Sequence, residues 1–369
     1  MTGLRLEIDL DAVAHNARTL VDRLAAVGVS VTGVTKASLG AAPLARALLA
    51  AGVRTLGESR IENVESLRRA GITAPITLIR SPLITEAQRV VEHTRTSLVT
   101  ELAVLRALSV AAGELGRDHG VVLMVELGDL REGILPADLG TVVDETLRLP
   151  GLVLRGIGTN LACQSGAAPD TANMTQLSDL ADTIEAATGA TLEVVSGGNS
   201  ANLDWALGNP DVGRVNDLRL GESILLGCET LERRPLDGLR TDAFTLVAEV
   251  IEAKLKPSTP WGELHQTAFG TAAAVPVRDA DDAARVILAV GRQDVDPGGL
   301  HAPSGMEVLG ASSDHLVLRA DGPVPHVGAE VRLTVCGYEA LLRAMTSPFV
   351  TRCFTGTGAH STPERAPAT

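Results

Sequence analysis

The chain has 369 residues, of which 45% are hydrophobic and 21% are charged, a composition typical of a globular protein. This length allows two domains, or one barrel with an appended domain. The net charge of −13 at pH 7 argues against a surface that binds nucleic acid. No apolar run approaches the length of a membrane span, and the first residues lack a basic region followed by an apolar core, so we expect a cytoplasmic protein.

The cysteines and histidines do not predict a metal site, because neither residue type shows the spacing of metal ligands. We expect the cysteines to be free thiols in a reducing compartment, and the histidines to be surface or structural residues. The cysteines are Cys163, Cys228, Cys336 and Cys353, and the histidines considered are His265, His301, His315 and His326.

The first predicted elements are a strand over residues 4–8, which alternate between polar and apolar, and an amphipathic helix over 11–24, with Asp9 or Asp11 as its cap. Short apolar runs then alternate with helical stretches. The runs predict strands at 29–35, 54–57, 76–79, 96–99, 121–127, 153–158, 192–196 and 215–220. The longer stretches predict helices at 43–51, 101–115, 171–187 and 200–207.

Eight strands separated by helices over about two hundred residues match the length and repeat of a (β/α)8 barrel. An open doubly wound sheet is the alternative, because periodicity does not reveal whether a sheet closes on itself. We therefore predict an α/β fold with a TIM-like barrel over residues 9–233.

The pattern changes after Arg233-Arg234-Pro235. Turn residues now separate strands, and little helix is predicted. This part is predicted to be a C-terminal all-β domain over residues 234–354, joined by the strand at 4–8, and followed by a disordered tail at 355–369 that is rich in Thr, Pro, Ala and Gly. Its predicted strands are 244–253, 284–290, 307–318 and 330–335.

Lys36 ends the first predicted barrel strand, where the apolar run gives way to small residues. Ligands of α/β domains bind at the carboxyl ends of the strands. A desolvated lysine amine in that position can form a Schiff base with an aldehyde. Lys36 by itself is equally compatible with a lysine that ends a strand and reaches into water.

Two other strand ends predict an anion site. Residues 196–200 (Ser-Gly-Gly-Asn-Ser) lead from the seventh strand into a helix, and residues 219–223 (Arg-Leu-Gly-Glu-Ser) follow the eighth. Phosphate commonly binds after these two strands of the barrel, at backbone N–H groups that glycines leave accessible. A simple helix entry would also explain the two glycines. A lysine opposite a phosphate cradle suggests pyridoxal 5′-phosphate as cofactor, since this cofactor needs both.

Five stretches together resemble the alanine racemase superfamily of fold-type III pyridoxal phosphate enzymes, and within it the ornithine racemase branch is most similar. The similarity extends from Ile8 to about Phe349, in the same order and through both domains. The stretches are residues 34–36 with 125–133, 196–200, 216–223 and 310–316.

The resemblance implies a role for each matching residue. Lys36 would carry the cofactor and act as one proton-transfer base, and Arg131 would lie near the phenolic oxygen of the cofactor. Asn160 would lie under the pyridine ring, and Arg219 would face the ring nitrogen. The phosphate would be bound by Asn199, Ser200 and the backbone amides of Gly221 and Glu222.

The sequence departs from alanine racemases at functional positions. Met124 stands where many of them have a carbamylated lysine, so Arg131 must be oriented in another way. Leu39 replaces a tyrosine that contacts phosphate. Phe269 stands at the position of the tyrosine base and cannot carry a proton, and Tyr338, the only tyrosine, matches nothing catalytic.

We therefore expect a racemase of ornithine or a similar amino acid. The alternatives are another fold-type III activity, such as an amino-acid decarboxylase or a D-amino-acid lyase, and a non-catalytic protein that binds the cofactor. Neither Cys336-Gly337 nor Cys353-Phe354 supplies the Cys-Asp pair common in the decarboxylases. The resemblance also implies a homodimer whose sites combine one barrel with the β domain of the partner.

The second proton-transfer base and the substrate contacts remain open. Cys163 follows Asn160 at the end of the sixth strand, and His315 follows an aspartate in the β domain, so both are candidates for the base. Asp294 and Asp314 are candidate partners for a basic substrate side chain. A small buried residue, a structural histidine and solvated loop acids are the respective alternatives.

Overall fold

The computed structural model describes residues 3–209, 211–270, 283–357 and 364–365. The chain forms two compact units, one over Asp11–Arg240 and the other from Met1–Leu10 together with Thr241–Thr369. The predicted boundary between the two domains, after residue 233, lies before the observed boundary at Arg240. The reason is that Asn16 in the first unit holds Arg240, donating from Nδ2 to its carbonyl (2.8 Å) and accepting from its N–H (2.7 Å).

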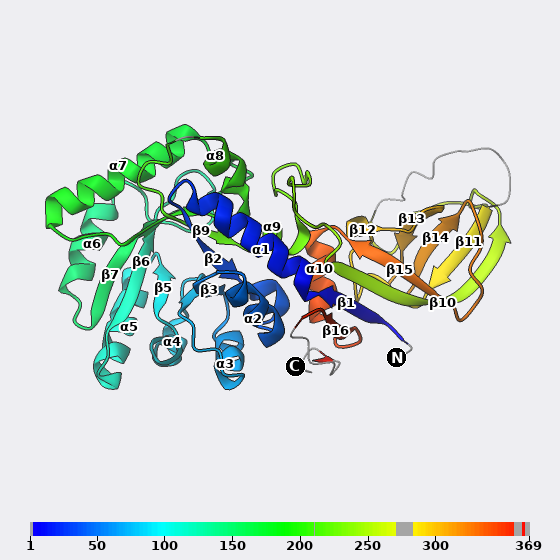
Figure 1. Cartoon of the computed structure of the whole chain (residues 1–369), viewed down its shortest axis with the longest axis horizontal. Helices are drawn as coiled ribbons and strands as arrows, with labels where there is room; N and C mark the ends of the chain where they lie inside the picture. The colour runs from blue at the N-terminus through cyan, green and yellow to red at the C-terminus, as the bar shows by residue number, and fades with distance from the viewer. Residues whose placement is uncertain (1–2, 210, 271–282, 358–363, 366–369) are drawn as a thin grey trace. The chain divides into compact units, whose positions relative to one another are not determined.

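The first unit is a closed barrel of parallel strands (Figure 1). Each strand pairs in parallel with its neighbour, and the last pairs with the first, with Ser30 opposite Asp217. The closed sheet confirms the barrel and excludes the open sheet. The strands are β2 (Ser30–Val34), β3 (Thr55–Glu58), β4 (Ile76–Leu78), β5 (Thr96–Val99), β6 (His119–Met124), β7 (Leu152–Gly158), β8 (Val194–Gly198) and β9 (Asp217–Leu220).

Helices follow the barrel strands and cover the outside of the barrel. Local signals set their ends: α7 begins with a capping box between Asp170 and Asn173 and ends at Gly189, whose φ is 69°. The helices are α1 (Leu10–Ala25), α2 (Ala42–Ala50), α3 (Ile61–Arg69), α4 (Ala87–His93), α5 (Leu102–Leu115), α6 (Leu139–Arg148), α7 (Thr171–Thr188), α8 (Leu203–Gly208) and α9 (Glu222–Leu226).

The barrel wall is apolar because both of its faces are covered. All six residues of β6 are buried, and Leu98, Val122 and Met124 pack together in the core. This packing explains why the sequence shows continuous apolar runs instead of alternation. Polar side chains therefore lie together where the strands end.

The second unit is built on a mostly antiparallel sheet in which β1 (Arg5–Asp9) pairs antiparallel with β10 and parallel with β16. One helix, α10 (Tyr338–Thr346), belongs to this unit and buries Leu341, Ala344 and Met345. The other strands are β10 (Phe244–Lys256), β11 (Ala283–Leu288), β12 (Leu300–His301), β13 (Met306–Ala311), β14 (Leu316–Ala320), β15 (Glu330–Val335), β16 (Thr351–Thr355) and β17 (Glu364–Arg365).

Two details of this unit differ from the prediction. The stretch 307–318 is a hairpin of β13 and β14, because the chain turns where the Ser312 N–H donates to the carbonyl of His315 (2.9 Å). The helix α10 was not predicted. Of the predicted tail, 358–363 and 366–369 lie outside the described residues, and β17 pairs with β16. Across the residues that the structure describes, no helix has the length and apolarity to span a membrane.

Candidate active site

Lys36 lies at the carboxyl end of β2, where it begins the short 3-10 turn Lys36–Ser38, and its side chain is exposed. Thr35, the residue before Lys36, fixes this turn. The Thr35 hydroxyl donates to Glu58 Oε2 (2.9 Å), and the Thr35 carbonyl accepts from the Ser38 hydroxyl (2.8 Å). The backbone of Lys36 is thus held while its amine remains accessible.

Glu58 ends β3 and is fully buried. Its carboxylate accepts hydrogen bonds from Thr35, from the Ser59 N–H (2.7 Å) and from Asn63 Nδ2 (3.2 Å). Burial raises the pKa of Glu58, and these donors counteract the rise. A buried carboxylate at this position therefore links the ends of β2 and β3.

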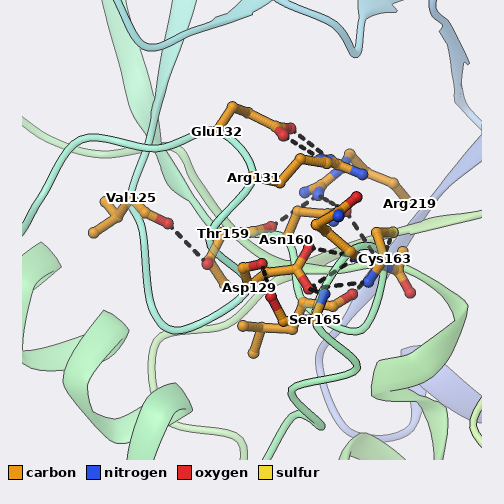
Figure 2. A network of polar contacts seen from close by, with 12 residues as sticks. Val125, Asp129, Arg131, Glu132, Thr159, Asn160, Cys163, Ser165 and Arg219 are labelled. Atoms are coloured by element: carbon orange, nitrogen blue, oxygen red, sulfur yellow. Dashed lines mark hydrogen bonds and ion pairs between the residues drawn. The ribbon is translucent and has the colours of Figure 1, made fainter.

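Arg219 in β9 is buried at the centre of a polar network (Figure 2). Its guanidinium donates to the Thr159 carbonyl (2.8 Å), to Asn160 Oδ1 (3.3 Å) and to Ser196 Oγ (2.5 Å). The Ser196 hydroxyl donates in turn to Asp217 Oδ2 (2.6 Å). Burial lowers the pKa of Arg219, and Asp217 counteracts this by its charge. The end of β9 therefore presents a fixed guanidinium.

Asn160 completes this network from the end of β7. Its Oδ1 accepts from Asn199 Nδ2 (3.1 Å) as well as from Arg219. Its Nδ2 is buried and has no hydrogen-bond partner among the described residues. Buried donors are normally paired, so this amide is available to a bound group.

Ser200 and Ser223 bring the ends of β8 and β9 together. Both are buried, their hydroxyl oxygens lie 3.0 Å apart, and the Ser223 N–H donates to Ser200 Oγ (3.2 Å). A Cβ at Gly221 would lie 3.1 Å from Val34 Cβ, so a larger residue there would crowd β2. The two predicted phosphate segments therefore meet at paired hydroxyls.

Arg131 and Cys163 lie beside the Arg219 network (Figure 2). Glu132 pairs with the Arg131 guanidinium through both carboxylate oxygens, and this pairing raises the pKa of Arg131. The Cys163 thiol is exposed, contributes to the same rise, and accepts from Asn199 Nδ2 (3.4 Å). Glu132 is thus the group that orients Arg131.

Asp129 fixes the loop that carries Cys163. Its buried carboxylate accepts from the backbone N–H groups of Cys163 (3.2 Å), Gln164 (3.1 Å) and Ser165 (3.0 Å). Three backbone donors are thereby satisfied by one carboxylate, which gives the exposed thiol a defined position.

Backbone strain gathers at this end of the barrel. Among the described residues, the non-glycine residues with positive φ are Leu39 (53°), Leu130 (53°) and Ala162 (57°), which lie in loops after barrel strands, and Arg233 (60°), which follows α9 and pairs with Glu222. Such strained conformations persist where many surrounding contacts hold them, and they cluster at functional sites.

A cavity of about 250 Å³ opens at the opposite, amino end of the barrel and reaches Ser196, Asp217 and Arg219 from inside. This volume is below the roughly 300–1,000 Å³ of typical small-molecule pockets. The strained loops and the unpaired amide instead favour the carboxyl end as the candidate site.

The remaining predicted residues belong to the second unit. Asp294 is buried and accepts from the Ser347 hydroxyl (2.7 Å), whereas Asp314 is exposed and accepts from Gln293 Nε2 (2.8 Å). His315 is exposed in the turn between β13 and β14. Phe269 is exposed, and the guanidinium of Arg292 lies 5.2 Å from the centre of its ring.

Sequence reasoning identified the residues at strand ends but missed those that support them. Glu58 and Asp129 act through contacts between separate strands and loops. The carboxylates of Glu132 and Glu222 were also missed, although both residues stand within segments that had been singled out. A charged residue within a barrel strand, as Asp217 is, was the available signal for the network around Arg219.

The part of the chain that forms the barrel matches a known family. Residues 8–227 match the model of the alanine racemase N-terminal domain. The lysine racemase of Thermotoga maritima is 38% identical over 95% of this chain and 98% of its own length. The ornithine racemase of Acetoanaerobium sticklandii is 33% identical over 94% and 98% of the two chains.

The fold agrees with these relatives. The crystal structure of alanine racemase from Streptomyces lavendulae superposes with a TM-score of 0.76, covering 97% of this chain and 98% of that one at 22% identity. The chain belongs to the alanine racemase family.

Proposed function

We propose that the protein is a pyridoxal 5′-phosphate-dependent amino-acid racemase that acts on ornithine or lysine. The observation that carries the proposal is the set of residues at the carboxyl end of the barrel: an accessible lysine, a buried arginine and paired serine hydroxyls. Near full-length similarity to a lysine racemase and an ornithine racemase supports the substrate class.

The residues present fit this cofactor. The unpaired Nδ2 of Asn160 offers a donor beside Arg219, and Ser200 and Ser223 offer hydroxyls to a phosphate. In this assignment Lys36 carries the cofactor, Asn199 and the amides of Gly221 and Glu222 complete the phosphate site, and Arg131 contacts the phenolic oxygen.

When bound, the cofactor supplies an electron-withdrawing ring that makes the Cα hydrogen of the substrate acidic. Arg219 keeps its proton, since guanidinium groups are not deprotonated in proteins, and therefore acts only as a donor. Arg219 would therefore leave a ring nitrogen beside it unprotonated, and a cofactor held in this way would be a weaker electron sink with fewer side reactions. The Lys36 amine takes the proton on one face and returns it there.

Racemisation needs a second group on the other face. We infer that Cys163 is this base, because its thiol is exposed, lies against Arg131 and is held by the loop that Asp129 caps. His315 is the competing candidate. Cys163→Ala should abolish racemisation but leave exchange of the α-hydrogen with deuterated water for one enantiomer. If Cys163→Ala racemises at the parent rate and His315→Ala does not, the assignment passes to His315.

The decisive experiment supplies the purified protein with pyridoxal 5′-phosphate and separate L and D forms of ornithine, lysine, alanine and serine. Chiral chromatography should show conversion of either ornithine or lysine enantiomer to a 1:1 mixture, and Lys36→Ala should show none. Borohydride treatment should fix a pyridoxyl label on Lys36. Amine release would indicate a decarboxylase, aldehyde or keto-acid release a lyase, and cofactor binding without turnover a carrier.

The cellular setting is part of the same proposal. We expect a cytoplasmic homodimer, with each site completed by the partner. Light scattering of the holoenzyme tests the dimer, and mixing Lys36→Ala protomers with protomers altered in the β domain tests the sharing of sites. A monomer with full activity would contradict this arrangement.

A further inference from the structure

Glu222, the first residue of α9, has its carboxylate at the same end of the barrel as Lys36. Its side chain is only 16% exposed. Burial raises the pKa of Glu222, while the charges of Arg233 and Lys36 oppose this rise. β2 and β9 are paired neighbours, with Gly33 opposite Leu220, so Lys36 and Glu222 follow adjacent strand ends.

The ion pair with Arg233 occupies only one of the two oxygens of the Glu222 carboxylate. Arg233 donates through Nη1 to Oε1 of Glu222, and no other hydrogen bond to this carboxylate is found among the described residues. A carboxylate has about four acceptor positions, so Oε2 remains available to a second donor. The Arg233 side chain is 54% exposed, whereas the carboxylate is largely buried.

The loop that presents Arg233 is pre-formed. The buried carboxylate of Glu229 accepts from the N–H groups of Leu231 (2.7 Å), Glu232 (3.0 Å) and Arg234 (2.7 Å). Arg233 itself adopts a left-handed conformation with φ of 60°. A strained residue on a braced loop is thus aimed at Glu222, where it orients the carboxylate and opposes the rise in its pKa.

Four other carboxylates of the barrel unit near this end are already used. Glu58 and Asp129 are buried and accept three hydrogen bonds each, and Glu132 binds Arg131 with both oxygens. Glu229 caps its own loop. Glu222 therefore differs from them, since it has burial, a fixed orientation and a free oxygen together.

We propose that Glu222 is the specificity-determining residue, whose free carboxylate oxygen accepts the terminal ammonium of a basic amino-acid substrate, and that Arg233 positions it. This inference rests on the proposed racemase function and assigns the side-chain contact within the barrel unit. Desolvation strengthens such a pair relative to one at the surface, so it discriminates against neutral side chains of equal length.

The test compares each basic substrate with a neutral one of matched shape, lysine with norleucine and ornithine with norvaline, using holoenzyme. Glu222→Gln should lower the ratio of kcat/KM for basic over neutral substrate by about 10- to 100-fold, the range for a lost hydrogen bond to a charged group. Glu232→Gln, the same change at an exposed residue of the adjoining loop, should leave the ratio unchanged.

Glu222→Asp gives a second readout that does not depend on loss of activity. It withdraws the carboxylate by one methylene, so the preference should move from ornithine toward lysine, the longer side chain. Arg233→Gln should raise the pKa of Glu222, so preference for basic substrates should fall on the acidic side of the pH profile. Calorimetry should show that cadaverine binds the parent holoenzyme more tightly than 1-aminopentane, and that Glu222→Gln removes the difference.

The outcomes separate the two proposals. If the parent enzyme racemises no amino acid, the proposed function is wrong, whatever the variants do. If it racemises ornithine or lysine, but Glu222→Gln keeps the ratio and Glu222→Asp keeps the chain-length preference, the assignment of Glu222 is wrong and the function stands. If Glu222→Gln has a lowered melting temperature, the assignment of Glu222 is decided by the chain-length preference of Glu222→Asp and by calorimetry.

Discussion

Glu58 has a larger influence on Lys36 than its distance along the chain suggests. The carboxylate is fully buried and gathers donors from Thr35, Ser59 and Asn63. A buried donor left without an acceptor destabilises a protein by about 1–3 kcal/mol. The energetic role of Glu58 is therefore to satisfy these donors, and its functional role is to hold the turn that begins at Lys36.

Glu58→Ala is expected to lower the unfolding free energy of the barrel by about 1–3 kcal/mol, since one buried and two half-buried donors lose their acceptor. The turn at Lys36 should also loosen, so borohydride labelling of Lys36 should become slower or incomplete. Urea unfolding and peptide mapping measure the two effects. Asn63→Ala removes only the longest of the three bonds and serves as the milder control. Equal stability of Glu58→Ala and the parent would show that the bonds contribute nothing.

Arg219 sets the chemistry at the ring nitrogen in the proposed reaction. A carboxylate in its place would hold a proton on that nitrogen and strengthen the ring as an electron sink. Arg219→Glu should therefore slow racemisation and raise the fraction of turnovers that end in transamination, measured as keto acid formed per racemised product. Arg219→Lys keeps the charge but loses the planar fork, so it should slow the reaction without raising that fraction. An unchanged fraction in Arg219→Glu would refute this role.

At the scale of elements, the loop after β7 is ordered by a carboxylate from the loop after β6. Asp129→Ala would leave the N–H groups of Cys163, Gln164 and Ser165 without their acceptor. We expect a loss of about 2–4 kcal/mol of stability and faster reaction of the Cys163 thiol with a disulfide reagent. Asp129→Asn retains one acceptor oxygen and should have a smaller effect.

The thiol measurement needs its own control, because the chain has three other cysteines. The same Asp129 variants are made with Cys163→Ala, and the faster phase should then disappear. A thiol rate that is unchanged by Asp129→Ala would mean that the loop keeps its conformation without the carboxylate.

The elements that the sequence predicted are those whose burial produces a local signal. Barrel strands such as β6 are covered on both faces and form apolar runs, and Lys36 and Arg219 stand at or near the ends of β2 and β9. The hairpin of β13 and β14 was read as one strand, because the turn at residues 312–315 has no Gly or Pro to mark it. The roles of Glu58, Asp129 and Glu222 depend on contacts between distant segments, which no spacing reveals.

At the scale of the whole molecule, the barrel contains a buried histidine that none of the proposed chemistry uses. His119 begins β6, is 1% exposed, and has Nε2 at 2.8 Å from Ser97 Oγ on the neighbouring strand β5. Its Nδ1 is buried without a partner among the described residues. Burial, with smaller contributions from Arg117 and Arg95, lowers the pKa of His119 to about 4.

This pKa shift makes the stability of the barrel depend on pH. The direction of that dependence follows from whether the folded or the unfolded chain binds the proton more readily. An unfolded histidine has a pKa of about 6.5, so as the pH falls the unfolded chain takes up a proton before the folded one does. The contribution of neutral His119 is therefore complete above about pH 6.5, declines as the pH falls toward 4, and is then lost. A displacement from 6.5 to about 4 corresponds to about 3 kcal/mol.

Replacing His119 with glutamine removes the titration while keeping a polar side chain beside Ser97. Between pH 7 and pH 4, the barrel of His119→Gln should lose about 3 kcal/mol less stability than that of the parent. Because the chain has two compact units, a single unfolding midpoint would mix their transitions, so amide hydrogen exchange within β5 and β6 is the appropriate measure. Other titrating groups, among them Glu58 with its raised pKa, act equally in both proteins and cancel in the difference. Parallel pH profiles would mean that His119 is protonated as readily in the folded barrel as in the unfolded chain.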